Sequence, residues 1–440
     1  MALAGGIRCT TTALQAPISP RMRLAVVSTV SMSTASSSTM ELDGYARTSQ
    51  NQYAAHTHTR HLLQASMERL AQRCNFEDQA SCMDGAPRRR RHIVDLGSAD
   101  GTSSMTTLQF AISTLNQAIQ SISPTNDGPI PLHITFEEHP ASDEAKLRST
   151  LDNHDEWFKQ NNISRDVLMR SFYEPLFQPQ SIDFLMSYIC LHWLDSSSTE
   201  EISAWKRLDI DNTDTENGQL LNFTQVNETA APDNVREHWR TNLAHRHLAN
   251  FLAFRANELR PGAEAVLLMV GHPHGFMTPM DGGPNPLTRA MGRCIERRNI
   301  REAILRRTIV PYFLRTEEDV RAAFDTAADI EISPENKPDA SITRAEHESK
   351  PGALLELVDC HSFETITAGS GDDVIGGAFD LFWSIHSNSI ISSGATDEEM
   401  NTLKEETRRV FDELYTAKEG ISSTFVALVV RKRTRVKWGA

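Results

Sequence analysis

Three short apolar runs in the first half of the chain each end on polar residues. The runs are 92–94, 132–136 and 181–191, and they are followed by Asp95, by Glu137-Glu138 and by His192-Trp193. Continuous apolar runs of this length are typical of strands that are buried on both faces, as in parallel sheets. We therefore predict an α/β fold in which these polar residues meet at one edge of the sheet.

The second half of the chain carries further helix and strand patterns. We predict a helix over 234–259 that stops at Pro261-Gly262, strands over 265–270, 354–358 and 424–430, and a helix over 397–417. Glycines 369, 371, 376 and 377 are expected to mark turns. The stretches 196–232 and 277–351 interrupt the sheet pattern, so we expect them to form cap insertions over the strand ends.

The segment D-L-G-S-A-D-G at 95–101 predicts a strand, a glycine turn and then a helix over 105–120. Such a turn can bind a nucleoside, although an ordinary turn between strand and helix is the alternative. Glu138 follows about forty positions later, where a carboxylate at the tip of the second strand can accept hydrogen bonds from two ribose hydroxyls. The pyrophosphate pattern G-x-G-x-x-G is absent, which favours a cofactor without phosphates such as S-adenosylmethionine.

His192 and Trp193 follow the third apolar run. One interpretation is an aromatic cluster that closes the core. The other is that an imidazole N–H and an indole N–H beside the cofactor turn converge on one anion.

An ordered series of short motifs resembles the SABATH methyltransferases, named for salicylate, benzoate and theobromine enzymes. The motifs are Y-A-R-T-S-Q-N-Q at 45–52, D-L-G-S-A-D-G at 95–101, E-H-P-A-S-D at 138–143, S-F-Y at 171–173, L-H-W-L at 191–194 and V-P-Y-F-L-R-T-E-E-D-V at 310–320. The resemblance spans residues 43–432, and it implies a Rossmann-like methyltransferase sheet with a helical cap. Members transfer a methyl group from S-adenosylmethionine to small carboxylic acids or, in the caffeine branch, to purine nitrogens.

The same resemblance implies roles for individual residues. Those implied to line the S-adenosylmethionine site are Tyr45, Asp95, Gly97, Glu138, Ser171 and Phe172. Gln52, His192 and Trp193 are implied to hold the acceptor carboxylate.

Three departures from the family pattern limit what can be carried over. Ser103 replaces the family asparagine after the turn, Ile189 replaces the tyrosine before L-H-W, and residues 306–309 replace the segment D-S-F-N. Because that last segment supplies a metal site in some members, we expect no metal here. The altered acceptor positions leave the acid unidentified.

Composition restricts the class of partner. The chain has 440 residues, of which 39% are apolar, and a net charge of −14. This charge disfavours nucleic acid and anionic membrane as partners, and no apolar run is long enough to span a bilayer, so we expect a soluble protein. The run 88–91, four arginines, is interpreted as a solvated loop. A homodimer is left open.

The first forty residues contain three arginines, no acidic residue and thirteen Ser or Thr. This composition is typical of a transit segment, which predicts import into a plastid or mitochondrion ahead of a methyltransferase domain over 41–440. A disordered tail, a misplaced start codon and a cytoplasmic location are the alternatives. The six cysteines show neither a C-x-x-C pair nor zinc spacing, so free thiols in a reducing compartment are expected.

The sequence therefore predicts an S-adenosylmethionine-dependent O-methyltransferase that forms methyl esters of small carboxylic acids. Three alternatives stay open: N-methylation of purine-like acceptors, a catalytically silent cofactor-binding protein on the same scaffold, and a nicotinamide oxidoreductase.

Overall fold

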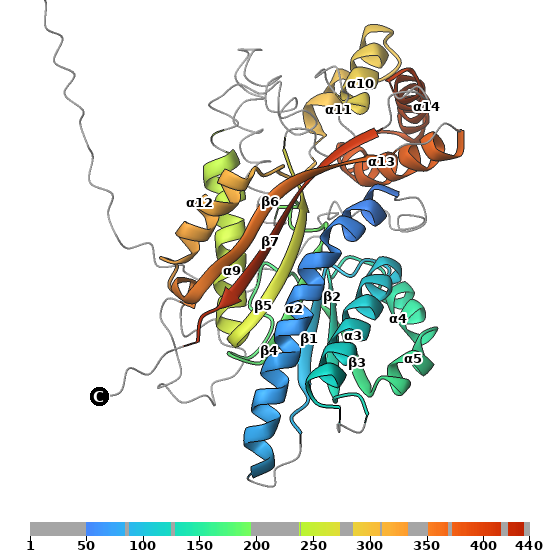
Figure 1. The fold of residues 1–440 in the computed structure, drawn as a ribbon. Helices are drawn as coiled ribbons and strands as arrows, with labels where there is room; N and C mark the ends of the chain where they lie inside the picture. Colours follow the sequence, from blue (N-terminus) through green and yellow to red (C-terminus); the bar gives the residue numbers. More distant parts are fainter. Residues whose placement is uncertain are drawn as a thin grey trace, which may run out of the picture. The chain divides into compact units, whose positions relative to one another are not determined.

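A seven-stranded mixed sheet forms the centre of the fold (Figure 1). The structure is a computed structural model that describes residues 50–83, 88–124, 128–194, 237, 239–272, 285–308, 310–332, 351–367, 372–414 and 421–434. The strands are β1 (Arg91–Leu96), β2 (Leu132–Glu138), β3 (Ile163–Met169), β4 (Ile182–Tyr188), β5 (Leu259–Val270), β6 (Leu355–Thr367) and β7 (Ile421–Lys432).

The strand order is β3-β2-β1-β4-β5-β7-β6. β1 pairs in parallel with both β2 and β4, β3 and β5 continue the parallel part on either side, and β7 and β6 are antiparallel to their neighbours. The chain order reverses at β1, so the carboxyl ends of β1, β2 and β4 lie at a topological switch point, where ligands bind in open α/β sheets.

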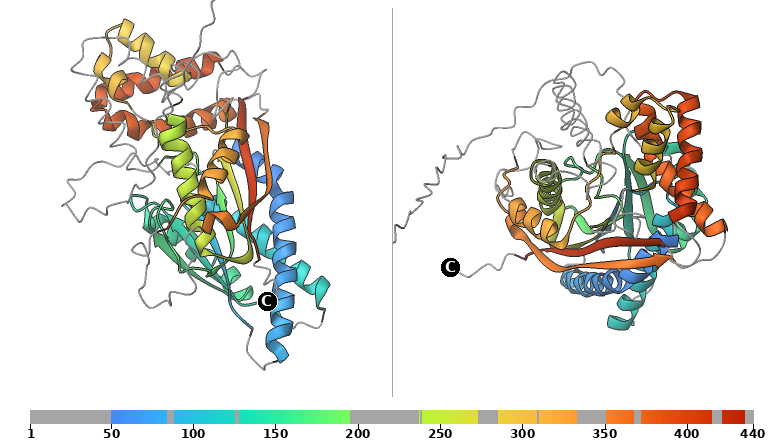
Figure 2. Two further views of the ribbon diagram at one scale, coloured as in Figure 1. Left: turned by 90° about the vertical axis from the view of Figure 1, so that its left-hand side faces the viewer. Right: turned by 90° about the horizontal axis from the view of Figure 1, so that it is seen from above.

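Helices cover both faces of the sheet (Figure 2). One face carries α2 (Gln50–Met83), α3 (Thr102–Ile122), α4 (Glu144–Asp152) and α5 (Asp155–Gln160), while the other carries α9 (Arg246–Glu258) and α12 (Glu317–Ala327). Neighbouring strand residues alternate between the two cores: Ile93 packs with α2 and α3, whereas Val94 packs with α9. A π-helical turn, η2 (Trp239–His245), precedes α9, and a 3₁₀ turn, η5 (Pro351–Leu354), precedes β6.

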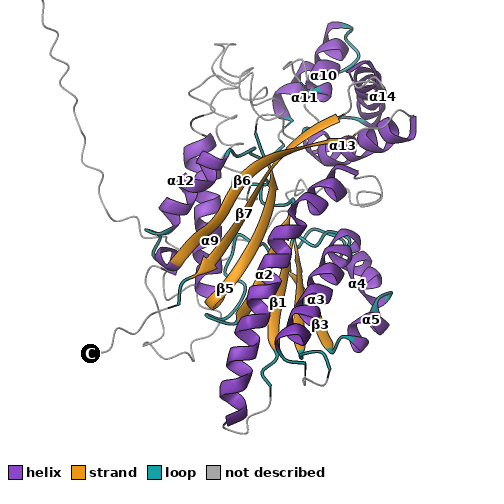
Figure 3. Ribbon diagram, in the orientation of Figure 1, coloured by secondary structure: helices purple, strands orange, loops and turns teal. Residues whose placement is uncertain are grey.

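A separate hydrophobic cluster joins four helices beyond one end of the sheet (Figure 3). They are α10 (Pro286–Glu296), α11 (Glu302–Arg307), α13 (Asp372–Ser392) and α14 (Asp397–Leu414). Trp193, which follows β4, packs against this cluster, so these helices lie at the carboxyl end of the parallel strands. The two helices α10 and α11 come from within 277–351, whereas residues 1–40 and 196–232 lie outside the described part of the chain.

The structure confirms the predicted strands and the strand-turn-helix at 95–101, with different bounds. β5 begins at Leu259 and contains Pro261-Gly262, which the sequence placed at the end of a helix. The pairing of β4 with β5 shifts register there, so that the Pro-Gly pair occupies an irregularity that tolerates a missing N–H. Strand β3 was missed altogether, and Gly376 and Gly377 lie inside α13 rather than in turns.

The arginine run 88–91 is not a solvated loop. Arg91 is only 1% exposed and forms ion pairs with Glu77 and Asp78 at the end of α2, while Arg89 pairs with Asp183 of β4. These contacts fasten α2 to the start of the sheet. Within the described residues, no helix is both long enough and apolar enough to cross a membrane.

Candidate active site

The turn after β1 is closed around Gly97. Its φ is 74°, and that of Gly101 is 83°, a region that disfavours side chains. A Cβ at Gly97 would lie 2.6 Å from Cys190 Sγ and 2.7 Å from its Cβ, just after the end of β4. The backbone N–H groups of Gly97 and Ser98 donate to the carbonyl of Glu137, both at 3.0 Å. The sequence needs glycine here because the turn is pressed between β2 and the residues after β4.

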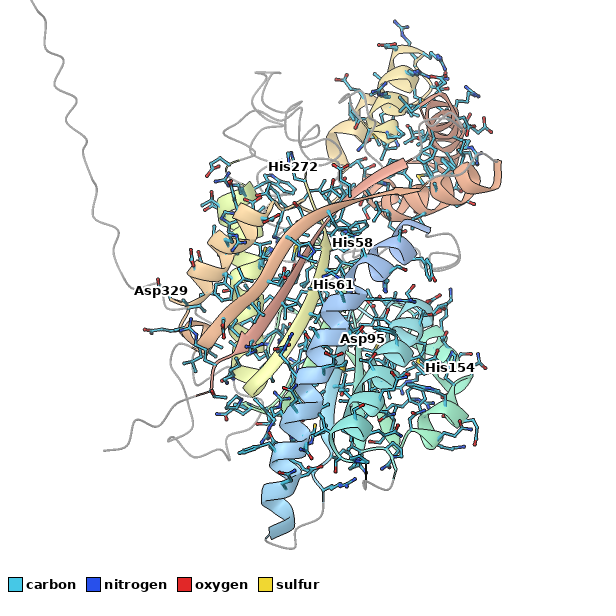
Figure 4. The ribbon with its side chains drawn as sticks, in the orientation of Figure 1. His58, His61, Asp95, His154, His272 and Asp329 are labelled. Atoms are coloured by element: carbon cyan, nitrogen blue, oxygen red, sulfur yellow. The ribbon has the colours of Figure 1, made fainter. Side chains whose placement is uncertain are left out.

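Asp95 lies at the end of β1, next to the start of α3 (Figure 4), and is 3% exposed. Ser98 Oγ donates to its carboxylate at 3.0 Å. Burial raises the pKa of Asp95 to about 6; hydrogen bonds from Ser104 and Ser98 oppose this rise, and the charge of Glu138 adds to it. Asp95 is therefore a mostly ionised carboxylate at neutral pH that lacks a cationic partner among these groups.

Glu137 and Glu138 end β2 on opposite faces. Glu138 accepts hydrogen bonds from Ala99 N–H at 2.5 Å, His139 N–H at 2.8 Å and Ser142 Oγ at 2.9 Å. Because a carboxylate can accept about four hydrogen bonds, one acceptor position remains. Glu137 is fully buried: Oε2 accepts from Gly97 N–H at 3.0 Å, and Oε1 has no partner among the described residues. Burial and the neighbouring Glu138 raise its pKa well above the ordinary value.

The S-F-Y segment after β3 is held by a buried ion pair. Arg255 of α9 donates to the carbonyls of Phe172 at 3.1 Å and Glu174 at 2.7 Å, and it pairs with Glu258 at 2.8 Å. Glu258 also accepts the N–H groups of residues 176 and 177. Arg255 and Glu258 are each 1% exposed. This clamp keeps the Phe172 ring beside the turn, 4.0 Å from where a Gly97 Cβ would lie.

His192 and Trp193 lie on a loop that begins where Ile189 takes a φ of 59°. His192 is 7% exposed, and its Nδ1 has no hydrogen-bond partner among the described residues. Burial, assisted by the nearby charge of Arg315, lowers the pKa of His192 to about 3. The Trp193 ring lies edge-on to Tyr312, with centroids 5.9 Å apart. His192 is therefore neutral and scarcely basic at physiological pH.

The structure brings several of the sequence-predicted residues to one edge of the sheet. Asp95, Gly97, Glu138 and Phe172 surround the turn, whereas Ser171 uses its hydroxyl within its own loop, accepting from Tyr173 N–H at 3.3 Å. Tyr45 and the side chain of Gln52 lie outside the described part of the chain.

Sequence reasoning missed the residues that hold these loops. Arg255, Glu258 and Arg315 each act through contacts far away in the sequence, and a charged residue buried in this way leaves no local pattern. Glu137 did have a signal, since it stands beside Glu138 at the end of an apolar run. Glu137, whose Oε1 has no partner among the described residues, lies at the same edge of the sheet as Glu138.

The donor set at this edge fits S-adenosylmethionine better than a dinucleotide. Asp95 suits a cationic group, and the free acceptor position of Glu138 suits a ribose hydroxyl. A pyrophosphate would meet three acidic side chains. Of the described residues, no group of three His, Cys, Asp or Glu is placed to hold a metal ion.

Comparisons with known proteins agree with this chemistry. Residues 36–359 match the family model described as SAM-dependent carboxyl methyltransferase, and no curated protein matches significantly. A solved loganic acid methyltransferase with SAH is 15% identical, with a TM-score of 0.59, and the match covers 89% of this chain and 97% of that one. A phosphoethanolamine N-methyltransferase from Haemonchus contortus is 10% identical over 80% of this chain and 50% of that one, with a TM-score of only 0.31.

The first of these structures shows the same fold. The family model spans most of the chain, including the glycine turn, S-F-Y, L-H-W-L and the segment at 310–320. The chain therefore belongs to the S-adenosylmethionine-dependent carboxyl methyltransferases, and its cofactor is S-adenosylmethionine.

Proposed function

We propose that the enzyme forms methyl esters of small carboxylic acids by direct in-line transfer from S-adenosylmethionine. When bound, this cofactor supplies an electrophilic methyl group on a sulfonium. On its side of the site, Asp95 would face the ammonium group, Glu138 the ribose and Phe172 the adenine ring. On the acceptor side, His192, Trp193 and Gln52 would orient one carboxylate oxygen and leave the other directed at the methyl group.

The observation that carries this proposal is the state of His192. A buried imidazole with an unpaired nitrogen, placed after β4 beside Trp193, needs a hydrogen-bonding partner. With a pKa of about 3 it is too weak a base to remove a proton from a hydroxyl or amine at neutral pH. His192 therefore supplies no base here, which favours a nucleophile that is already ionised at neutral pH, as a carboxylate is.

Positioning then accounts for the catalysis. Holding the oxygen and the methyl group in attack geometry can supply roughly 7–11 kcal/mol in favourable cases. The neutral donors restrain the carboxylate without protonating it. The four cap helices beyond the strand ends would keep water out of the site.

The test is product analysis with labelled S-adenosylmethionine and a panel of small acids, phenols and purines. We expect methyl esters, which mild alkali cleaves. His192→Ala and Trp193→Phe should each slow transfer to the best acid at least about tenfold while cofactor affinity stays within a few fold. His133→Ala is the matched control, because His133 lies at the opposite end of β2, where it contacts Ser164.

Two results would contradict the proposal. An alkali-stable product would indicate transfer to nitrogen or to another oxygen. Equal loss of cofactor binding and turnover in both site variants would mean that His192 and Trp193 contact the cofactor and not the acceptor.

A further inference from the structure

A small cavity lies between α2 and α3, beside the candidate active site. Its volume is about 130 Å³, below the roughly 300–1,000 Å³ of pockets that enclose whole drug-sized ligands. It is lined by side chains from α2 (His56, Arg60), from the start of α3 (Ser103, Thr106, Thr107) and from the end of β4 (Tyr188). A space of this size can accept one end of a cofactor, not a complete nucleoside.

The cavity adjoins the carboxylate at the end of β1. Tyr188 lines it; burial raises the pKa of the Tyr188 phenol, and the charge of nearby Asp95 adds to that rise. Ser103 lines it two residues after Gly101, the glycine at which the turn ends. The cavity and the glycine turn are thus neighbouring parts of one edge.

The cavity carries a positive charge, whereas the side chains around the glycine turn are acidic. Arg60 is the one cationic side chain among the described residues that line it, and none of those residues is acidic. The pKa of His56 is lowered to about 4, by burial and then by Arg60, so His56 adds no charge at neutral pH. Ser103 supplies a hydroxyl donor, whereas the hydroxyls of Thr106 and Thr107 donate to the α3 carbonyls of Thr102 and Ser103.

Arg60 is an exposed side chain of α2 that forms no ion pair with another described residue. In the described part of the chain no carboxylate pairs with it, and its guanidinium carbon lies 5.2 Å from the centroid of the Phe110 ring. By contrast, Arg69 and Arg73, on the same helix, pair with Glu264 and Asp183. A guanidinium held over an aromatic ring, at a cavity that the Ser103 hydroxyl also lines, suits a carboxylate ligand.

We propose that this cavity holds the amino-acid end of S-adenosylmethionine, with Arg60 pairing with its α-carboxylate while Asp95 faces its ammonium group. The two charges of an α-amino acid sit on one carbon atom, so their partners must be adjacent, as the cavity and Asp95 are. The assignment depends on the cofactor and not on which acid is methylated. Arg60 is then a cofactor-binding residue that the sequence motifs do not include.

The experiment is calorimetry of the full-length protein, without acceptor, with S-adenosylmethionine and with its decarboxylated analogue. The wild type should bind the complete cofactor at least about tenfold more tightly, the worth of one charge-assisted hydrogen bond. Arg60→Ala should weaken binding of the complete cofactor by at least that factor and leave the analogue within about twofold. Arg60→Lys should fall between, and Arg148→Ala, an exposed arginine on α4 outside the cavity, should bind as the wild type does.

The outcomes separate binding from folding. If Arg60→Ala weakens both ligands equally, Arg60 acts through its packing on Phe110, and the proposal is wrong. If the wild type does not distinguish the two ligands, the proposal fails even where Arg60→Ala cannot be purified folded. Acid methylation could persist in either case, so the test does not depend on the proposed acceptor chemistry.

Discussion

Replacing Asp95 by Asn should stabilise the cofactor-free protein and weaken cofactor binding. Asp95 is 3% exposed, and its carboxylate accepts hydrogen bonds from the hydroxyls of Ser104 and Ser98 rather than pairing with a cation. Asparagine has almost the same shape and keeps an acceptor for Ser98 Oγ. It removes the buried charge, which is the part of Asp95 that folding disfavours and that an ammonium ligand needs.

The magnitude follows from the pKa of Asp95, which burial raises from 3.8 to about 6. One pKa unit corresponds to about 1.36 kcal/mol, so ionised Asp95 costs the folded state about 3 kcal/mol above pH 6. Because the folded pKa lies above the unfolded one, the cost declines as the pH falls below 6, is about half at pH 5, and is nearly gone by about pH 3. For 440 residues, about 2.1 cal/mol/K per residue makes 3 kcal/mol worth about 3 °C in Tm.

Thermal unfolding of wild type and Asp95→Asn at pH 7.5 and pH 5 measures this difference. The variant should unfold up to about 3 °C higher at pH 7.5, and its advantage should shrink at pH 5. S-adenosylmethionine should raise the Tm of the wild type much more than that of the variant. A variant less stable than the wild type at pH 7.5, or an advantage that does not change with pH, would refute the reasoning.

Asp183 offers a control of opposite sign. It is 1% exposed, but Arg89 and the N–H of His92 bind its carboxylate. Burial acts to raise the pKa of Asp183, yet hydrogen bonding and charge from Arg89 outweigh it and leave the pKa below the ordinary value. Its contribution to stability is present above pH 3.8 and is lost as the pH falls further. Asp183→Asn should therefore destabilise the protein at both pH values.

Two further substitutions test the loops around the site. Glu258→Ala should lower the free energy of unfolding, measured in urea, by about 3–5 kcal/mol, because it leaves Arg255 buried without its partner. The double variant Arg255→Met/Glu258→Met should recover part of this loss, since it removes both buried charges. Equal losses in the two variants would contradict this explanation. Gly97→Ala should abolish the binding of S-adenosylhomocysteine measured by calorimetry, because the new Cβ would overlap Cys190. Adding Cys190→Gly should restore part of the binding. If it restores none, backbone strain at residue 97 alone is responsible.

The parts of the fold that the sequence predicted are those with a strong local pattern. β1, β2 and β4 are buried on both faces, so each appears as an apolar run. β3 is an edge strand whose residues after Ile163 are mostly half-buried, and its polar positions conceal it. β6, at the opposite edge, extends far beyond the predicted 354–358 for the same reason, because residues such as Asp359 and His361 need not be apolar there.

The residues of the candidate site likewise divide into those that a local sequence pattern predicts and those that it does not. Gly97 and Asp95 are predictable because turn geometry and strand position are encoded within a few residues. The partners that position Phe172 and Trp193 are not, because they come from α9 and from the segment after α11. Gly376 and Gly377 show the limit of composition alone: packing in α13 overrides their weak helix propensity.

The long-range contacts link the cofactor side and the acceptor side of the site. The Tyr173 hydroxyl donates to the Trp193 carbonyl, which joins the loop that carries Phe172 to the loop that carries His192. Arg315 donates to the carbonyls of Leu191 at 2.7 Å and Ala244 at 2.9 Å, and so joins the L-H-W loop to the turn before α9.

Arg255 of α9 donates a hydrogen bond to the Phe172 carbonyl and so connects α9 back to the loop that carries Phe172. Arg255 and Arg315 have almost no solvent exposure. A change that took away the groups they bind would therefore leave a buried charge without a partner, and not merely a missing contact. Neither loop can then move without disturbing the other. The relative placement of Phe172 and Trp193, on which alignment of methyl group and acceptor depends, is therefore maintained by residues that touch neither ligand.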